Sequence, residues 1–243
     1  MTPSLKLPDI PDSPPARWDA RWKLAAVLVA VGGIAALNHL APSAVALAVG
    51  LILLVVARLP RKWLRVRLSL FAFAALPFVL VLPFTLDTPQ RGLVVGLAVF
   101  CRGVAIGAFA LLLVGTAPVH RTITAAHKLK VPGLLVLLAL LAYRYVFLLA
   151  DELRRLRVAL RVRGFRASAT RRGYQTLGHV AGAVLVRGAD RADRVSDAMR
   201  CRGFDGRFHT LTAFRTTPAD VVSFQLVACG AVALVVWDRR ILS

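Results

Sequence analysis

The sequence is poor in acidic residues, lysine and cysteine. Its 243 residues include only 12 Asp and Glu against 32 Lys and Arg, and only five of these cations are lysines. None of the lysines follows a glycine, so there is no Gly-Lys-Ser/Thr phosphate loop, which excludes a P-loop ATPase. The three cysteines, Cys101, Cys201 and Cys229, form no metal-type pair and predict no disulfide framework.

Clusters of metal ligands or catalytic acids are also lacking. The five histidines are scattered, with no His-x-x-Glu-His spacing, so we expect no metal centre in this chain. Asp190, Asp193 and Asp197 fall at i, i+3 and i+7, but arginines lie between them. This pattern predicts exposed ion pairs within one helix, such as Asp190 with Arg194, in place of a catalytic acid cluster.

What the chain has in excess is apolar residues. Hydrophobic residues make up 58% of the sequence and charged residues 18%, and the mean hydropathy is +0.67. A soluble domain is nearer half apolar and a quarter charged, so this composition indicates a multi-span membrane protein. In such a protein the formal charge of +20 marks cytoplasmic loops and contact with anionic membrane lipid. No aromatic residues interleave the basic segment 151–215 in a stacking pattern, so no nucleic acid is expected as a partner.

Apolar runs that could cross the membrane divide the sequence. The first two runs are short for a hydrocarbon core of about 30 Å, which needs about 20 helical residues, and residues 38–42 join them in a tight hairpin. Residues 58–67 and 120–130 are basic and are predicted to be cytoplasmic loops. Residues 87–90 form a short turn on the opposite side. The five predicted spans are 24–40, 44–57, 68–86, 92–116 and 221–237.

One further apolar run, 131–150, is long enough to cross, but the distribution of charge argues against it. With the N-terminus inside, four spans return the chain to the cytoplasm at His120. A crossing at 131–150 would then place residues 151–215, with fifteen Lys and Arg against six Asp and Glu, outside. We therefore predict that 131–150 is a helix that does not cross and lies near the cytoplasmic face or against other helices.

Arg102 lies about ten residues into the fourth predicted span. A charge in the middle of a membrane is costly and usually faces protein or water. Two interpretations stay open: Arg102 faces such a partner, or the helix begins later and the side chain reaches the membrane surface.

These patterns predict an all-α polytopic membrane protein with about five transmembrane helices and a cytoplasmic arm of amphipathic helices. The first 18 residues hold five prolines and predict a cytoplasmic lead-in with no cleavable signal peptide. The predicted regions are an N-terminal lead-in at 1–23, four transmembrane helices at 24–117, a cytoplasmic or interfacial region at 118–215 and a C-terminal transmembrane helix at 216–243.

A heptapeptide that contains two arginines occurs twice in the basic segment. Residues 159–165 and 198–204 both read Ala-x-Arg-x-Arg-Gly-Phe. Each copy ends an amphipathic helical pattern, with apolar and arginine stripes on different faces. The apolar stripes are Leu149, Leu153, Leu156 and Leu160 in the first helix and Ala192, Val195 and Met199 in the second.

Helix capping explains part of this repeat. A Gly just past a helix end is a common cap, and Arg in the last turn complements the helix dipole. Capping accounts for the Gly and one Arg, but not for the repeated Ala and Phe. An arginine fork at a helix tip suits bidentate capture of a carboxylate. Two equivalent tips therefore predict a partner with two equivalent docking grooves.

The chain resembles the transmembrane T component of energy-coupling-factor transporters, in particular the cobalt-type CbiQ group, over nearly its whole length from Trp18 on. The paired heptapeptide is the most specific element; its second copy lies within 196–206, where Cys201 replaces the usual Ala. Residues 19–24 match the opening motif of the family, Asp-Pro-Arg-x-Lys-Leu, except that Ala20 stands in place of the Pro. The matching landmarks are residues 19–24, 116–118, 129–132, 144–145 and 152–155.

The resemblance implies a coupling subunit that is not an enzyme and carries no cofactor. Arg163 and Arg202 would be the coupling arginines, and their helices would dock into two ABC-type ATPase subunits. ATP and Mg would bind those subunits, and cobalt would bind a separate substrate-binding membrane subunit. Residues 131–150 would offer that subunit an apolar surface that includes Val131, Pro132, Leu135 and Leu138. The remaining ATPase-coupling residues would be Ala159, Val162, Gly164, Ala198, Cys201 and Gly203.

By the same resemblance, we expect a multi-pass protein of the bacterial cytoplasmic membrane, with its N-terminus and arm in the cytoplasm. The substrate would be cobalt or nickel, with cobalt favoured by the Arg-Gly-Phe-Asp-Gly form of the second copy. Two alternatives stay open at this point: a T component of a vitamin-type importer, and a lipid-modifying membrane enzyme with a basic arm. The enzyme would need an acidic metal cluster near a membrane boundary, and the sequence contains none.

Overall fold

The computed structural model describes residues 18–85, 88–129, 131–165, 168, 170–204 and 216–242. All regular secondary structure in these residues is α-helical. The chain divides into two compact units, one formed by residues up to 129 together with those from 212 on, the other by residues 130–211. We call the described residues of the first unit the body and those of the second unit the arm.

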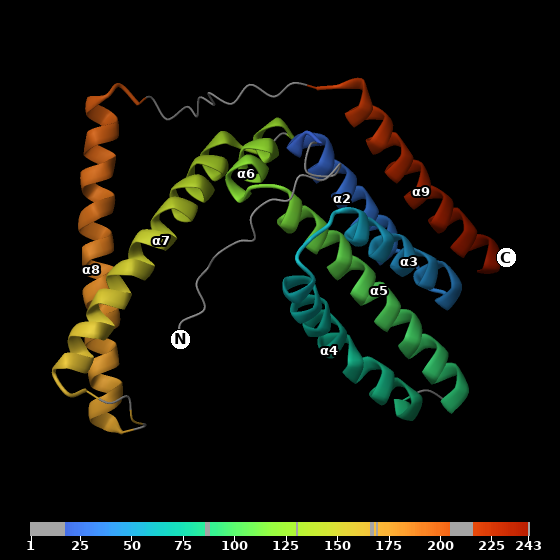
Figure 1. Ribbon diagram of the computed structural model, residues 1–243, viewed down its shortest axis with the longest axis horizontal. Coiled ribbons are helices and arrows are strands. Elements are labelled where there is room, and N and C mark those ends of the chain that lie inside the picture. The colour runs from blue at the N-terminus through green and yellow to red at the C-terminus, as the bar shows by residue number, and fades with distance from the viewer. Residues whose placement is uncertain are drawn as a thin grey trace. The chain divides into compact units, whose positions relative to one another are not determined.

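The body contains six helices and the arm two among the described residues (Figure 1). In the body these are α2 (Ala20–Ala35), α3 (Leu40–Val56), α4 (Arg61–Thr85), α5 (Pro89–Thr116), α6 (Val119–Lys128) and α9 (Pro218–Leu242). In the arm they are α7 (Gly133–Val162) and α8 (Arg171–Cys201).

The helices confirm an all-α polytopic membrane architecture. Four of them, α4, α5, α7 and α9, are long and apolar enough to cross a membrane. The first two predicted spans are short, as the sequence indicates: α2 has 16 residues and α3 has 17. Helix α7 continues the apolar run 131–150 into the amphipathic segment as one helix of 30 residues. That α7 does not cross the membrane stays a prediction, because length and composition alone do not decide it.

Two predicted loops are wrong, because much of each is helical. Residues 61–67 form the first two turns of α4, which begins directly after Pro60, a residue that is favourable just before or at a helix start. Residues 119–128 form α6, which follows Pro118 and buries Thr124 and Ala125. Both segments were predicted as loops from charge, yet Arg and Lys are good helix formers.

The hairpin between α2 and α3 is shorter than predicted. The connection spans residues 36–39, and Pro42 lies inside the first turn of α3. A proline in this turn removes no helical hydrogen bond, because the first amides of a helix have no partner within it. The predicted break at Pro42 is therefore wrong by a few residues.

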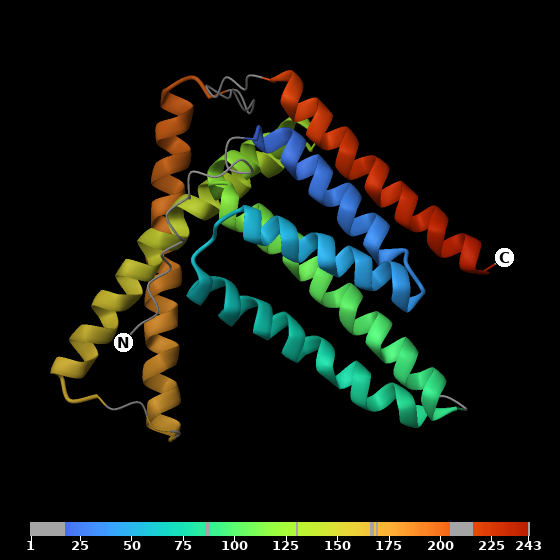
Figure 2. The ribbon, with the colours of Figure 1, turned by 45° about the vertical axis from the view of Figure 1, so that its right-hand side comes forward.

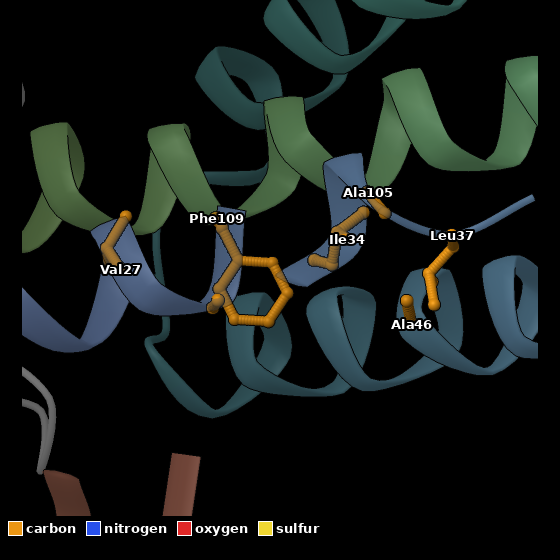
Figure 3. Close-up of a cluster of buried hydrophobic side chains, with 7 residues drawn as sticks. Val27, Ile34, Leu37, Ala46, Ala105 and Phe109 are labelled. Atoms are coloured by element: carbon orange, nitrogen blue, oxygen red, sulfur yellow. The ribbon is translucent and has the colours of Figure 1, made fainter. Parts of the chain in front are cut away.

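The body core lies where α2, α3 and α5 meet. Phe109 of α5 packs among side chains of α2 and α3 (Figure 3). The other members of this cluster are small or branched, which allows the helices to approach closely. They are Val27, Ala30, Ile34, Leu37, Ala46 and Ala105.

Glycines of α5 bring α4 and α5 into close contact, and the two helices lie side by side in both views (Figure 1 and Figure 2). A Cβ at Gly92 would lie 2.6 Å from the carbonyl oxygen of Leu82, and one at Gly96 would lie 3.0 Å from Cα of Val79. Small residues at such spacing are typical of helix contacts in membranes, where backbone packing replaces the hydrophobic effect.

At one end of the body, polar side chains join α2 to α9. The carboxylate of Asp220, in the first turn of α9, accepts the backbone amide of Asp19 at 3.2 Å and that of Thr217 at 2.8 Å. The indole of Trp18 donates to the carbonyl of Asp220 at 3.3 Å. The N-terminal end of α2 is therefore fixed to the helix that comes last in the chain.

The same end of the body holds a buried lysine. Lys23 of α2 is 1% exposed, and its ammonium donates to the carbonyl and hydroxyl oxygens of Thr116 at 3.3 and 3.2 Å. Thr116 is the last residue of α5, where carbonyl groups lack helical partners, so a cation there is favourable.

At the other end, two side chains hold the α2–α3 connection. Arg102 of α5 donates to the carbonyl of Leu37 at 2.6 Å. Asp238 of α9 is 1% exposed and accepts the amides of Asn38 at 3.0 Å and His39 at 2.9 Å. Of the two interpretations of Arg102, the structure supports the first: its side chain faces protein, where it satisfies a carbonyl at the end of α2.

Candidate functional site: the two Arg-Gly-Phe helix ends

The first heptapeptide copy ends α7 in a Schellman motif. Gly164 has a φ of +76°, in the left-handed region that favours glycine. Its amide donates to the carbonyl of Arg161 at 3.0 Å, and the amide of Phe165 donates to the carbonyl of Leu160 at 2.9 Å. These are the two hydrogen bonds that define the motif.

The second copy ends α8 in the same way. Gly203 has a φ of +78°. Its amide donates to the carbonyl of Arg200 at 2.9 Å, and the amide of Phe204 donates to the carbonyl of Met199 at 3.0 Å. The repeated sequence therefore encodes a repeated backbone geometry, and the prediction that each Gly follows the last helical turn is confirmed.

Capping explains more of the repeat than the sequence suggests. An apolar residue two places beyond the C-cap commonly packs against a residue in the last turn of a Schellman motif. Phe165 and Leu160 are half-buried, and Met199 is half-buried with Phe204 36% exposed. The repeated Phe occupies the position where such an apolar residue occurs, so capping offers a reason for it that we did not expect from the sequence.

The remaining repeated residues of the two copies are exposed, although Ala198 and Arg202 also line a hollow between α7 and α8. Ala159, Val162 and Arg163 fall at i, i+3 and i+4, and all three are exposed, Val162 by 84%. Neither Arg163 nor Arg202 forms an ion pair or hydrogen bond with a described side chain. The second copy presents Ala198, Cys201 and Arg202 in the same register, also exposed. Ala159 and Ala198 are exposed, and their small side chains would allow a partner to approach the helix closely.

The two helix ends lie at opposite ends of a crossed pair. Figure 1 and Figure 2 show α7 and α8 crossing, with the end of α8 (orange) far from the end of α7 (yellow). At the crossing, Glu152 pairs with Arg187, and a Cβ added at Gly188 would lie 3.8 Å from Leu149. With 31 residues, α8 is about 46 Å long, so the two tips are separated by roughly that length.

The ion pairs of the arm differ from the prediction. Among the described residues, Asp190 and Arg194 do not lie within ion-pair distance, and the pair formed is between helices, Glu152 with Arg187. The apolar stripe of α7 is confirmed, because its four leucines are half-buried while the arginines on the other face are exposed.

Two connected hollows lie between α7 and α8, and reasoning from sequence missed both. One is an apolar groove of about 740 Å³ that includes Leu141, Tyr145 and Met199. The other, of about 510 Å³, is lined by four arginines together with Tyr145. The four arginines are Arg144, Arg191, Arg194 and Arg202. One indication of this hollow was present in the sequence, because Arg144 and Tyr145 form the Arg-Tyr landmark of the family.

The residues predicted to contact a substrate-binding subunit lie at the start of α7, at the opposite end of this helix from Arg163. Leu135 and Leu138 are 54% and 53% exposed, and Pro132 is also exposed, whereas Val131 is half-buried. The Asp205-Gly206 part of the second motif lies outside the described residues. Within the described residues, no three His, Cys, Asp or Glu side chains are grouped so that they could hold a metal ion.

Comparison with known proteins identifies the family. Residues 11–212 match the protein family described as CbiQ, cobalt transport protein. The chain is 30% identical over 168 residues to the cobalt transport protein CbiQ of Rhodobacter capsulatus, a match that covers 67% of each chain. It is also 26% and 24% identical to two uncharacterized proteins of Methanocaldococcus jannaschii. Those matches cover 59% and 63% of this chain but only 53% and 52% of the archaeal proteins. The chain, a multi-pass membrane protein with this repeated helix ending, therefore belongs to the CbiQ family of cobalt transport proteins.

Proposed function

We propose that this chain is the transmembrane coupling subunit of an energy-coupling-factor importer for cobalt or nickel ions. It transmits the ATP-driven movement of two ABC-type ATPase subunits to a substrate-binding membrane subunit, and it carries out no catalysis itself. The observation that carries the proposal is the pair of helix ends with the same cap geometry, each with an exposed Ala-x-x-x-Arg face. Membership of a cobalt transport family, and the name of the Rhodobacter relative, support the choice of substrate.

The chemistry of each tip suits an acidic groove on a partner. A guanidinium donates two parallel hydrogen bonds to a carboxylate, which fixes orientation as well as adding binding energy. Arg163 and Arg202 have no such partner within the described chain, so their donors are available. The small Ala one turn earlier on the same face allows a partner surface to approach the helix closely.

The crossing of α7 and α8 supports a role in transmitting movement. The helices are long, and the one ion pair between them in the described residues, Glu152 with Arg187, lies where they cross, close to the approach of Gly188 to Leu149. An exposed ion pair contributes only about 0–1 kcal/mol. If the two ATPase subunits move together on binding ATP, the tips they hold move together, and the angle between the helices changes at little cost.

The other partners and the orientation follow from the same proposal. The substrate-binding subunit packs on the apolar face near Leu135 and Leu138, where large side chains are exposed. ATP and Mg bind the ATPase subunits, and the transported ion binds the substrate-binding subunit. The N-terminus and the arm lie on the cytoplasmic side of a bacterial inner membrane, as the excess of positive charge predicts.

Replacing both tip arginines tests the proposal. In the Arg163→Glu, Arg202→Glu double variant, two carboxylates would face the acidic grooves of the partners, and like charges repel. We expect the ATPase subunits to be lost when the tagged variant is purified from membranes that produce the whole transporter. Uptake of radioactive cobalt into the same cells should fall to background.

The chain offers a matched control. Arg155 and Arg194 each lie eight residues before a tip arginine, they are exposed, and they preserve the same 39-residue offset. The Arg155→Glu, Arg194→Glu variant changes the charge of the arm equally and should retain the ATPase subunits. An intact, active complex in the tip variant would contradict the coupling role, and so would equal losses in both variants.

A further inference from the structure

The connection between α3 and α4 presents a group of cations from a rigid support. Arg58, Arg61, Lys62 and Arg65 are all exposed. The backbone between them is anchored, because Ala57 is fully buried and Leu59 is 5% exposed. Leu59 fits against α5 so closely that a Cβ at Gly115 would lie 2.8 Å from it. The backbone that carries these cations is therefore held in place, while the side chains themselves are exposed.

The conformation of Arg58 belongs to this arrangement. It is the one non-glycine residue with a positive φ, +51°, among the described residues. Such a backbone is uncommon for a residue with a Cβ, and its occurrence often accompanies function. Here it lies between buried Ala57 and buried Leu59, while the Arg58 side chain itself stays exposed beside the start of α4.

Within the part of the chain that the structure describes, no carboxylate forms an ion pair with these cations. The sequence has no Asp or Glu between Asp19 and Asp87. A fifth cation, Arg67, follows in the same helix, and its guanidinium lies 4.0 Å from the ring centre of Trp63. Trp is typical of the membrane–water boundary, which places this group at the level of lipid headgroups.

Directly beyond the cations, the surface of α4 becomes apolar. Val66, Leu70 and Phe73 are 63%, 61% and 75% exposed. They follow Lys62 at intervals of four, eight and eleven residues, so all four side chains lie along one stripe of the helix. A cationic end and an apolar stripe match the two parts of a phospholipid, a charged phosphate at the boundary and acyl chains below it.

We propose that this surface is a binding site for an anionic phospholipid. The phosphate group binds among Arg58, Arg61, Lys62 and Arg65, and the acyl chains lie along Val66, Leu70 and Phe73. A soluble anion would leave the apolar stripe without a partner, and a zwitterionic lipid would leave the cations without net counter-charge. The site is independent of the helix tips of the arm and of the transport proposal.

The test is competition between lipids that differ only in headgroup. The purified full chain in detergent is offered equal amounts of phosphatidylglycerol and phosphatidylcholine with identical acyl chains, and bound lipid is counted by native mass spectrometry. We expect a preference for phosphatidylglycerol that weakens as salt is added. The Arg58→Gln, Arg61→Gln, Lys62→Gln, Arg65→Gln variant should lower this preference about tenfold or more.

Matched controls make the result decisive. A variant with four exposed arm cations neutralised (Arg154, Arg155, Arg191 and Arg194 to Gln) should keep the preference. Should the first variant fail to fold, the Arg61→Gln, Arg65→Gln double variant should still show a reduced preference. The proposal is overturned if the unaltered chain shows no preference, or if the α3–α4 and arm variants lose it equally. Equal competition by water-soluble glycerol phosphate would also overturn it, because the acyl chains would then contribute nothing.

Discussion

The body and the arm are built from helices of similar length that are held in opposite ways. In the body, glycines bring backbones into contact, and buried charged side chains satisfy the ends of neighbouring helices. In the arm, only Val136 of α7 and Gly173 of α8 are buried, and one ion pair links the two helices. The helices of the arm have 30 and 31 residues and leave most of their surface exposed. Under the proposed function, partner subunits would cover part of this surface.

Glycine substitutions give the largest expected difference between the two regions. In Gly92→Ala, the new Cβ would lie 2.6 Å from the carbonyl oxygen of Leu82, and backbone cannot move aside as a side chain can. Such overpacking costs about 1–3 kcal/mol or more in free energy of unfolding. Gly188→Ala in the arm meets only Leu149 at 3.8 Å and gains up to about 1 kcal/mol of helix propensity.

Thermal unfolding of both variants in detergent, followed by circular dichroism, measures this difference. Gly92→Ala should lower the melting temperature strongly, and Gly188→Ala should leave it unchanged or raise it. A comparable drop in both variants would show that the arm is packed as tightly as the body.

Removing one acidic side chain from each region gives the next largest effect. Asp238→Ala leaves the amides of Asn38 and His39 without an acceptor in a buried position, which costs about 1–3 kcal/mol for each unsatisfied group. Glu152→Ala removes an exposed ion pair with Arg187, which is worth about 0–1 kcal/mol. Chemical unfolding of the two variants should show the larger loss in Asp238→Ala. An equal loss in free energy of unfolding in Glu152→Ala would contradict this difference between the body and the arm.

The last comparison concerns the two caps of the arm. Gly164→Ala and Gly203→Ala force a Cβ into φ values of +76° and +78°, at a cost of about 1–2 kcal/mol each. Nothing lies within 4 Å of either added Cβ, so the cost is conformational. Because few residues of the arm are buried, the melting temperature of each variant should stay close to that of the unaltered chain. Under the proposed function, each variant should nevertheless bind the ATPase subunits clearly more weakly. Loss of stability without loss of binding would show that the caps are purely structural.

Much of the body could be predicted from sequence because lipid-facing helices need long apolar runs. The fourth and last predicted spans fall within α5 and α9, and the described part of the third falls within α4. The contacts between them could not be predicted, since a run of apolar letters does not say which face meets which helix. The pairing of Lys23 with Thr116, or of Asp238 with the α2–α3 connection, joins residues distant in the sequence, and no local pattern encodes it.

The helix ends of the arm were predictable because the information is local. A Gly after an amphipathic helix fixes the cap within a few residues, and both caps occur where the repeat predicts them. The roles within the repeat were less accessible: the sequence alone does not show that Phe completes the cap while Ala faces outward. The errors at residues 61–67 and 119–128 have one cause, since charge was used to infer a loop when it specifies only a side of the membrane.

The contacts of α9 bear on how the protein is made. The amides of Asp19, Asn38 and His39, all near the start of the chain, find their acceptors on Asp220 and Asp238. A ribosome adds these acceptors only after residues 130–211 have been synthesised, so α2 and the α2–α3 connection are made well before the α9 side chains that accept their hydrogen bonds. Biogenesis of the body therefore requires that α2 and α3 remain unpaired with α9 while the arm emerges, and a nascent chain stopped before α9 would expose these groups to quality control.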